Sequence, residues 1–118
     1  MIKKAKKTNK FMLAIIITIV IVITIIMYTK LSNSNNDKDN LAQCLTKNGA
    51  KLYGAYWCPH CKEQKDLFGG SFKYINYIEC TEEKAQCVDI KSYPTWIINN
   101  QEYLGVKSLD QLKKLGGC

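Results

Sequence analysis

At 118 residues the chain has room for one small folded domain. Its formal net charge of +7 is unevenly placed, because residues 1–30 hold six lysines and no acid whereas residues 31–118 hold eleven lysines and ten acids. The second part is therefore nearly neutral, and the chain lacks arginine, which favours bidentate recognition of phosphates and bases. Together these observations disfavour nucleic-acid binding.

Residues 11–29 predict a transmembrane anchor. They carry no charged side chain and are rich in Ile, Val, Thr and Leu. As a helix they would extend roughly 28 Å, close to the hydrocarbon thickness of about 30 Å. A buried core helix is the alternative, but the polar stripe of a helix that packs on a small domain is missing. The five lysines of residues 1–10 predict a basic N-terminus that stays in the cytoplasm.

A cleaved secretory signal is a second alternative for this segment, because such signals also begin with a basic stretch. The apolar run is longer than usual, and no clear cleavage site follows it. In either case residues 41–118 would be translocated to the periplasmic or another extracytoplasmic side, with the lumen of a thylakoid or of the endoplasmic reticulum as alternatives. Residues 30–40, rich in Asn, Ser and Asp, predict a flexible linker.

The remaining residues alternate between helical and extended patterns. Aromatic and β-branched runs predict strands, while polar runs that are capped by Ser or stopped by Gly predict helices. We expect helices at residues 41–47, 58–68, 82–90 and 108–115, and strands at residues 51–57, 74–80, 95–98 and 102–104. The last two strands form a hairpin at Asn99 and Asn100, because Asn tolerates positive φ.

This order predicts the fold class. Strands separated by helices form parallel pairs through right-handed crossovers, and the final hairpin adds an antiparallel edge. The chain is therefore expected to be an α/β protein with a mixed sheet and helices on both faces, as in a compact thioredoxin-like fold. That domain covers residues 41–118.

The motif Cys58-Pro59-His60-Cys61 lies where a strand is expected to end and a helix to begin. At a helix N-terminus the unpaired N–H groups and the macrodipole favour a thiolate over a thiol. A protonated His60 would add a favourable charge. Cys58 is then the nucleophile, and Cys61, one turn along and more buried, resolves the mixed disulfide. Pro59 fits the first turn, where its missing N–H costs nothing.

Aromatic residues and a second proline accompany this motif. Trp57 and Pro59 would flank the cysteines and, with Tyr93 and Thr95, form the surface that binds a protein partner. Tyr93, Pro94 and Thr95 lie at the start of a predicted strand, where a proline must have a positional reason. An ordinary turn proline is the alternative.

All six cysteines follow the apolar run, and an even number in a translocated domain is typical of an oxidising compartment. Cys80 and Cys87 are expected to form a structural disulfide, with a relay pair that exchanges electrons with the Cys-Pro-His-Cys motif as the alternative. Cys44 and Cys118 are then left to each other by elimination, although Cys118 is also placed to pair between chains.

A zinc site formed by Cys58, Cys61, Cys80 and Cys87 is a further alternative. Structural zinc sites usually contain two closely spaced cysteine pairs, whereas the second spacing here is too long for that pattern. We therefore expect no metal and no cofactor.

Three stretches, GAYWCPHCKEQKDLFG, INYIEC and SYPTWIIN, together resemble the thioredoxin-like domain that is fused to, or works beside, homologues of vitamin K epoxide reductase. The Pro-His dipeptide is also similar to that of DsbA-type periplasmic oxidants. The resemblance implies that Cys58 and Cys61 are the redox pair, that Pro94 is a cis-proline, and that Tyr93 offers its backbone to an extended substrate. It also implies a quinone-linked membrane enzyme, such as a vitamin K epoxide reductase homologue, that reoxidises the pair; no such four-helix portion occurs in these 118 residues.

These features predict a membrane-anchored thiol-disulfide oxidoreductase that oxidises cysteines of translocated proteins. The oxidising direction follows from a stabilised thiolate, which favours the reduced form of the pair. A reductase or isomerase of the same fold is the first alternative. A redox-fold module without catalytic activity, which tethers a partner to the membrane, is the second.

Overall fold

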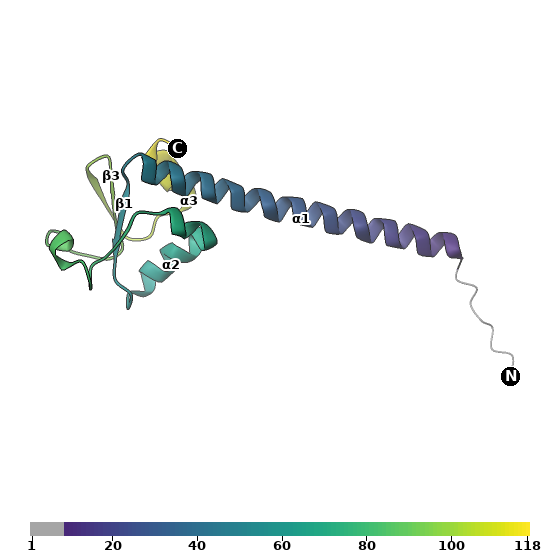
Figure 1. The fold of residues 1–118 in the computed structure, drawn as a ribbon, viewed down its shortest axis with the longest axis horizontal. Coiled ribbons are helices and arrows are strands. Elements are labelled where there is room, and N and C mark those ends of the chain that lie inside the picture. The colour runs from purple at the N-terminus through teal and green to yellow at the C-terminus, as the bar shows by residue number, and fades with distance from the viewer. Residues whose placement is uncertain (1–8) are drawn as a thin grey trace. The chain divides into compact units, whose positions relative to one another are not determined.

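The structure is a computed structural model that describes residues 9–118. Most of the predicted basic N-terminus, residues 1–8, lies outside the described residues. The chain divides into two units, one that ends at Ser34 and one that comprises Asn35–Cys118. The elements in Figure 1 are α1 (Lys10–Lys47), β1 (Lys51–Gly54), α2 (Pro59–Phe68), the 3₁₀ turn η1 (Gly69–Tyr74), β2 (Tyr77–Glu79), the 3₁₀ turn η2 (Lys84–Cys87), β3 (Thr95–Ile98), β4 (Gln101–Leu104) and α3 (Leu109–Gly116).

The first unit contains the apolar part of α1. One 18-residue window of this helix has a mean hydropathy of 3.0 and no buried residue, so the helix is long and apolar enough to cross a membrane. The hydroxyl groups of Thr18, Thr24 and Thr29 each donate a hydrogen bond to the carbonyl three residues earlier. Their polar groups are thus satisfied inside the helix, as a hydrocarbon environment requires.

Residues 30–40 are helical, which differs from the flexible segment that their composition predicts. Asn, Ser and Asp each cost only about 0.5 kcal/mol in a helix relative to Ala. Extending an existing helix is cheaper than nucleating a new one, and residues 30–40 contain neither Pro nor Gly. The helix ends at Lys47, where Asn48 and Gly49 form the expected stop, with Gly49 at φ 81°. The division into anchor, linker and domain remains a prediction.

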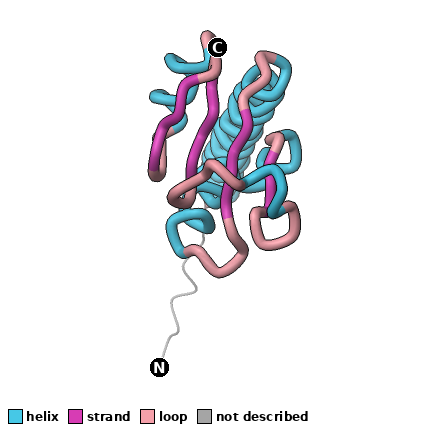
Figure 2. Tube along the Cα trace, turned by 90° about the vertical axis from the view of Figure 1, so that its left-hand side faces the viewer, coloured by secondary structure: helices cyan, strands magenta, loops and turns pink. Residues whose placement is uncertain are grey.

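The second unit contains a four-stranded mixed sheet in the order β2-β1-β3-β4. Strand β1 pairs in parallel with β2 and antiparallel with β3, and β3 forms a hairpin with β4. Figure 2 shows these strands in magenta. The hairpin turn is Asn99-Asn100, with φ of 52° and 61°. This topology confirms the predicted α/β class and is the arrangement of a thioredoxin-like fold.

The main core lies on one face of the sheet. Leu52 of β1 and Trp96 and Ile98 of β3 are at most 1% exposed and pack there. The connecting segments add Ala50 and Ile75, and the helices supply Leu41, Ala42, Leu45, Phe68 and Leu112. Packing of α2 on this face fixes where its N-terminus, and hence the cysteine motif, meets the end of β1.

The opposite face is covered by a shorter segment. Tyr53 and Ile78 pack there against the Cys80–Cys87 disulfide. A helix over residues 82–90 was expected, but only the turn η2 forms. The disulfide joins residues seven apart, and this short closure leaves room for a single 3₁₀ turn.

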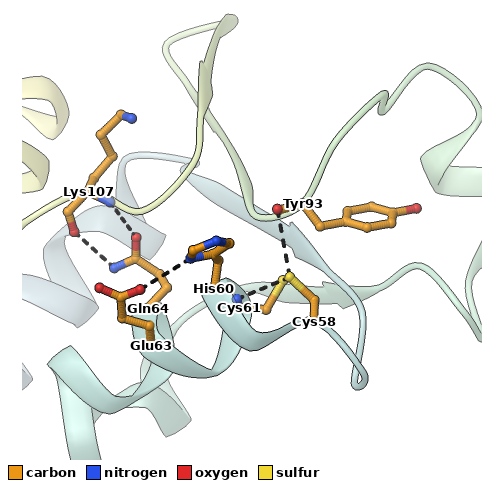
Figure 3. Close-up of polar contacts among 7 residues, drawn as sticks. All are labelled: Cys58, His60, Cys61, Glu63, Gln64, Tyr93 and Lys107. Atoms are coloured by element: carbon orange, nitrogen blue, oxygen red, sulfur yellow. Dashed lines mark hydrogen bonds and ion pairs between the residues drawn. The ribbon is translucent and has the colours of Figure 1, made fainter.

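A buried glutamine fixes α2 to the rest of the fold. The Gln64 side chain is fully buried, and its Oε1 accepts hydrogen bonds from Trp96 Nε1 at 3.1 Å and from the Lys107 backbone N–H at 2.7 Å. Its Nε2 donates to the Lys107 carbonyl at 3.0 Å (Figure 3). Because an unpaired buried amide is costly, these bonds specify one position for α2.

The last helix is capped at both ends as the sequence predicts. Ser108 and Gln111 form a reciprocal capping box at the start of α3, and Gly117 ends it with φ 67°. Cys118 is then bonded to Cys44 of α1, the pair that elimination suggests. This bond holds α3 against the last turns of α1.

Candidate redox-active site

Cys58 and Cys61 lie at the N-terminus of α2, and Cys58 follows the end of β1 by four residues (Figure 3). Cys58 is the N-cap residue, with an extended backbone at φ −84° and ψ 117°. Its Sγ accepts a hydrogen bond from the Cys61 backbone N–H at 3.2 Å, and Pro59 occupies the first helical position. The expected strand-to-helix junction is therefore present, with the Cys58 sulfur at the positive end of the helix.

Both sulfurs are shielded from solvent. Cys58 is 5% exposed and Cys61 is 1% exposed, and both are free thiols. Burial, together with the hydrogen bond and charge of Cys58, raises the pKa of the Cys61 thiol to about 12. Cys61 is therefore protonated at neutral pH, and any thiolate that forms there must be stabilised by its surroundings.

The segment before β3 lies beside Cys58. The Tyr93–Pro94 peptide bond is cis, as the resemblance implies, and the Pro94 side chain is fully buried. The Cys58 thiol donates to the Tyr93 carbonyl over 3.7 Å (Figure 3). Thr95 is fully buried, and its hydroxyl donates to the Ser92 carbonyl at 2.8 Å, so its side chain stabilises the loop, while its part in substrate binding stays a prediction.

His60 lies on the exposed side of α2. Its Nδ1 is 3.3 Å from Glu63 Oε2, and the two side chains are 73% and 60% exposed (Figure 3). A protonated His60 is therefore paired with Glu63, a partner that the motif alone did not suggest. In water such an exposed pair is weak and contributes little to stability.

Aromatic side chains surround the buried sulfurs. Tyr56 and Trp57 are 78% and 61% exposed, and the Trp57 and Tyr93 rings meet edge to face with centroids 6.1 Å apart. Pro59 is also exposed. The structure thus brings together Trp57, Pro59 and Tyr93, which the sequence assigned to substrate contact, as an apolar rim around Cys58.

Sequence reasoning missed a polar cluster beside Cys61. A β-carbon added to Gly54 would lie 3.1 Å from Cys61 Sγ and 2.8 Å from the Tyr77 hydroxyl. That hydroxyl donates to Glu79 Oε2 at 2.9 Å. Burial and this contact with Glu79 raise the pKa of Tyr77 far above its ordinary value. Tyr77 and Glu79 are two residues apart along β2 and therefore lie on the same face of the strand. This spacing is visible in the stretch INYIEC and is the sequence signal that could have indicated the cluster.

Glu79 is held as a carboxylate by several donors. Burial favours its neutral form, but hydrogen bonds from Thr81 and Tyr77 and from the Tyr56 backbone N–H outweigh burial and lower the pKa of Glu79. The Tyr56 contact joins β2 to the segment just before the cysteine motif. This carboxylate therefore orders both Tyr77 and the loop that carries Trp57.

The other four cysteines form two disulfides that do not involve the candidate redox pair. Cys80 and Cys87 are 6% and 7% exposed and joined to each other, as are Cys44 and Cys118. Two of the four thiols weighed as zinc ligands are thus consumed in a disulfide. Within residues 9–118, no group of three or more His, Cys, Asp or Glu side chains is placed to hold a metal ion.

No family model matches the chain. The curated protein "Thiol-disulfide oxidoreductase LTO1" from Arabidopsis thaliana is 42% identical to it over 88 residues. The matched region covers 65% of this chain and 23% of the plant protein. The chain thus spans less than a quarter of the length of this relative.

The close packing at Gly54 leads to a prediction. Gly54→Ala should displace Tyr77 and Cys61 and lower the free energy of unfolding by about 1 to 3 kcal/mol, as is usual for overpacking. Gly70→Ala is the matched control, because a β-carbon there meets no atom within 4 Å. Denaturant unfolding of both variants checks this, and equal stability of the two would show that the site tolerates the added methyl group.

Proposed function

We propose that this chain is a membrane-anchored thiol-disulfide oxidoreductase whose Cys58 and Cys61 alternate between dithiol and disulfide. The observation that carries the proposal is the placement of two free cysteines at the N-terminus of α2, with the Cys58 sulfur against the Tyr93 carbonyl. The name of the Arabidopsis relative supports the same activity.

In the oxidising direction, a substrate thiolate attacks Cys58 Sγ and the Cys58–Cys61 bond breaks. The electron pair stays on the Cys61 sulfur, which then takes up a proton. A second substrate thiolate attacks the substrate sulfur of the mixed disulfide, which releases Cys58 as a thiolate stabilised at the helix N-terminus. The substrate gains one disulfide, and Cys58 and Cys61 together gain two electrons.

The rim around Cys58 suits a protein substrate. Exposed apolar side chains such as Trp57 and Tyr56 offer contact area without demanding a particular sequence. An extended substrate segment would pair with the backbone at Tyr93, beside the reacting sulfur. Protein thiols and disulfides of translocated chains are therefore the proposed substrates.

The oxidising direction and the partner rest on the resemblance of the Pro-His dipeptide and of the surrounding stretches. A quinone-linked membrane enzyme, such as a vitamin K epoxide reductase homologue, would take two electrons from Cys58 and Cys61 and restore the disulfide. Anchoring by residues 11–29 would keep the two proteins in one membrane and raise their effective concentration.

The first prediction of this proposal concerns the trapping of partner proteins. Cys61→Ala should accumulate mixed disulfides with partner proteins, because Cys58 can still form the intermolecular bond while the resolving thiol is gone. The adducts should appear on non-reducing gels and vanish on reduction. Cys58→Ala is the matched control and should trap far less, because Cys61 is the more buried sulfur and lacks the N-cap position. Equal trapping by both variants would contradict the assigned roles, and a pair that merely stabilises a tethering module would trap nothing.

The second prediction concerns direction. The equilibrium potential of the Cys58–Cys61 pair should lie above roughly −200 mV, nearer to the oxidants than to thioredoxin at about −270 mV. Titration of the full-length chain in glutathione buffers measures it. A potential at or below that of thioredoxin would replace the oxidase proposal with the reductase alternative.

The third prediction concerns topology, since five lysines precede the apolar span. A cysteine introduced by Lys113→Cys, an exposed position on α3, should react with a membrane-impermeant thiol reagent in intact cells. A cysteine introduced by Lys6→Cys should react only after lysis. The reverse pattern would place the folded domain in the cytoplasm.

A further inference from the structure

Lys65 lies one helical turn beyond Cys61, on the same face of α2. Its Nζ is 4.0 Å from the centroid of the Tyr77 ring and 5.5 Å from that of Phe72. A cation over two aromatic rings is held in place more firmly than a free surface lysine. Lys62, on the same helix, is 76% exposed and pairs with Asp66, so it offers a natural comparison.

The Tyr77 side chain contacts both Lys65 and the surroundings of Cys61. Its ring carries the Lys65 cation, while its hydroxyl and Cys61 Sγ both lie about 3 Å from the same point beside Gly54, so these two atoms are no more than about 6 Å apart. The charged or titratable groups near the Cys61 sulfur or the Tyr77 side chain are Cys58 at the N-cap of α2, Lys65 on α2, and Tyr77 and Glu79 on β2.

Lys65 is the cation among these groups. Glu79 carries the opposite charge, and its hydrogen bonds from Thr81, Tyr77 and the Tyr56 backbone stabilise that charge. The positive charge of Lys65 lowers the pKa of Cys61, against the larger effect of burial, which raises it. The shared contact with Tyr77 and the sign of its charge both favour an effect of Lys65 on a Cys61 thiolate.

We propose that Lys65 is a positioning residue whose ammonium group, seated on the Tyr77 ring, stabilises the negative charge that forms on the Cys61 sulfur during disulfide exchange. This inference rests on the proposed function. When a thiolate attacks Cys58 Sγ, the Cys58–Cys61 bond breaks and its electron pair moves to the Cys61 sulfur, on the same helix face as this cation. The reverse step, attack by Cys61 on a mixed disulfide, begins from the same thiolate and gains in the same way.

The proposed role of Lys65 predicts an effect on the rates of disulfide exchange and not on its equilibrium. Lys65 should speed the opening and the closing of the disulfide equally, because both pass through a charged Cys61 sulfur. It should leave the equilibrium at neutral pH almost unchanged, because the Cys61 product is a thiol once it has taken a proton from water. A merely structural role would not separate rate from equilibrium in this way.

The test uses the oxidised full-length chain in detergent and β-mercaptoethanol, an uncharged thiol, as reductant. Lys65→Met should slow reduction of the Cys58–Cys61 disulfide by about threefold to tenfold, the size expected for a charge several ångströms away in a partly shielded site. Lys65→Arg should restore most of the rate, because guanidinium also stacks on aromatic rings. Lys62→Met should react like the unaltered chain, and the equilibrium constant with glutathione should stay within about twofold for every variant.

Acid quenching followed by alkylation and mass measurement gives the rates. Equal rates for Lys65→Met and the unaltered chain, or an equal slowing by Lys62→Met, would overturn the role of Lys65 while leaving the proposed function intact. An unaltered chain whose Cys58–Cys61 disulfide never forms or never accepts thiol would overturn both. Lys65→Gln supplies the same uncharged comparison should Lys65→Met fail to fold.

Discussion

The hydrogen bond from the Cys61 N–H to the Cys58 sulfur is the contact on which the rest of the site depends. It makes a thiol the N-cap of α2, so a reactive atom replaces the usual Ser or Asp at a helix start. Such a cap needs a strand that delivers the chain to this point, a helix that cannot shift, and a backbone segment that closes over the sulfur. Strand β1, the buried Gln64 and the Tyr93–Pro94 segment supply these three requirements.

The Cys61 sulfur, unlike that of Cys58, lies in surroundings that disfavour a thiolate. Cys61 is the more buried of the two, and burial disfavours the thiolate that exchange chemistry demands. Gly54 permits this depth, because any side chain there would collide with Tyr77 and crowd Cys61. Tyr77 lies near this sulfur, and its hydroxyl and ring contact the Glu79 carboxylate and the Lys65 ammonium group. The sulfur thus has polar groups in its vicinity that an apolar core would lack. The burial of Cys61 and the polar cluster near it are therefore two parts of one arrangement, which suits the resolving role that we propose for Cys61.

Local rules explain why much of this fold could be predicted from the sequence. Caps and turns such as Ser108, Gly117 and Asn99-Asn100 act within a few residues, and the Cys-Pro-His-Cys motif carries its own strand-to-helix junction. Contacts across the sheet could not be read in this way. The Tyr77–Glu79 cluster depends on the parallel register of β1 with β2, which no local pattern encodes, and the single turn η2 depends on a disulfide that limits its segment. At residues 30–40 a local prediction fails for another reason. Their composition only weakly favours a flexible chain, and the adjoining helix extends through them.

The two remaining disulfides connect stability with the proposed chemistry. A folded unit of this size has a small core, and such domains commonly need cross-links. In the chain-entropy model, a bond between residues 74 apart contributes roughly 4 to 5 kcal/mol and one between residues seven apart roughly 2 to 3 kcal/mol. Together these contributions rival the whole stability of an ordinary domain, which is about 5 to 15 kcal/mol. The domain would then be stable chiefly where disulfides persist, and the oxidation proposed for Cys58 and Cys61 would be useful under the same conditions.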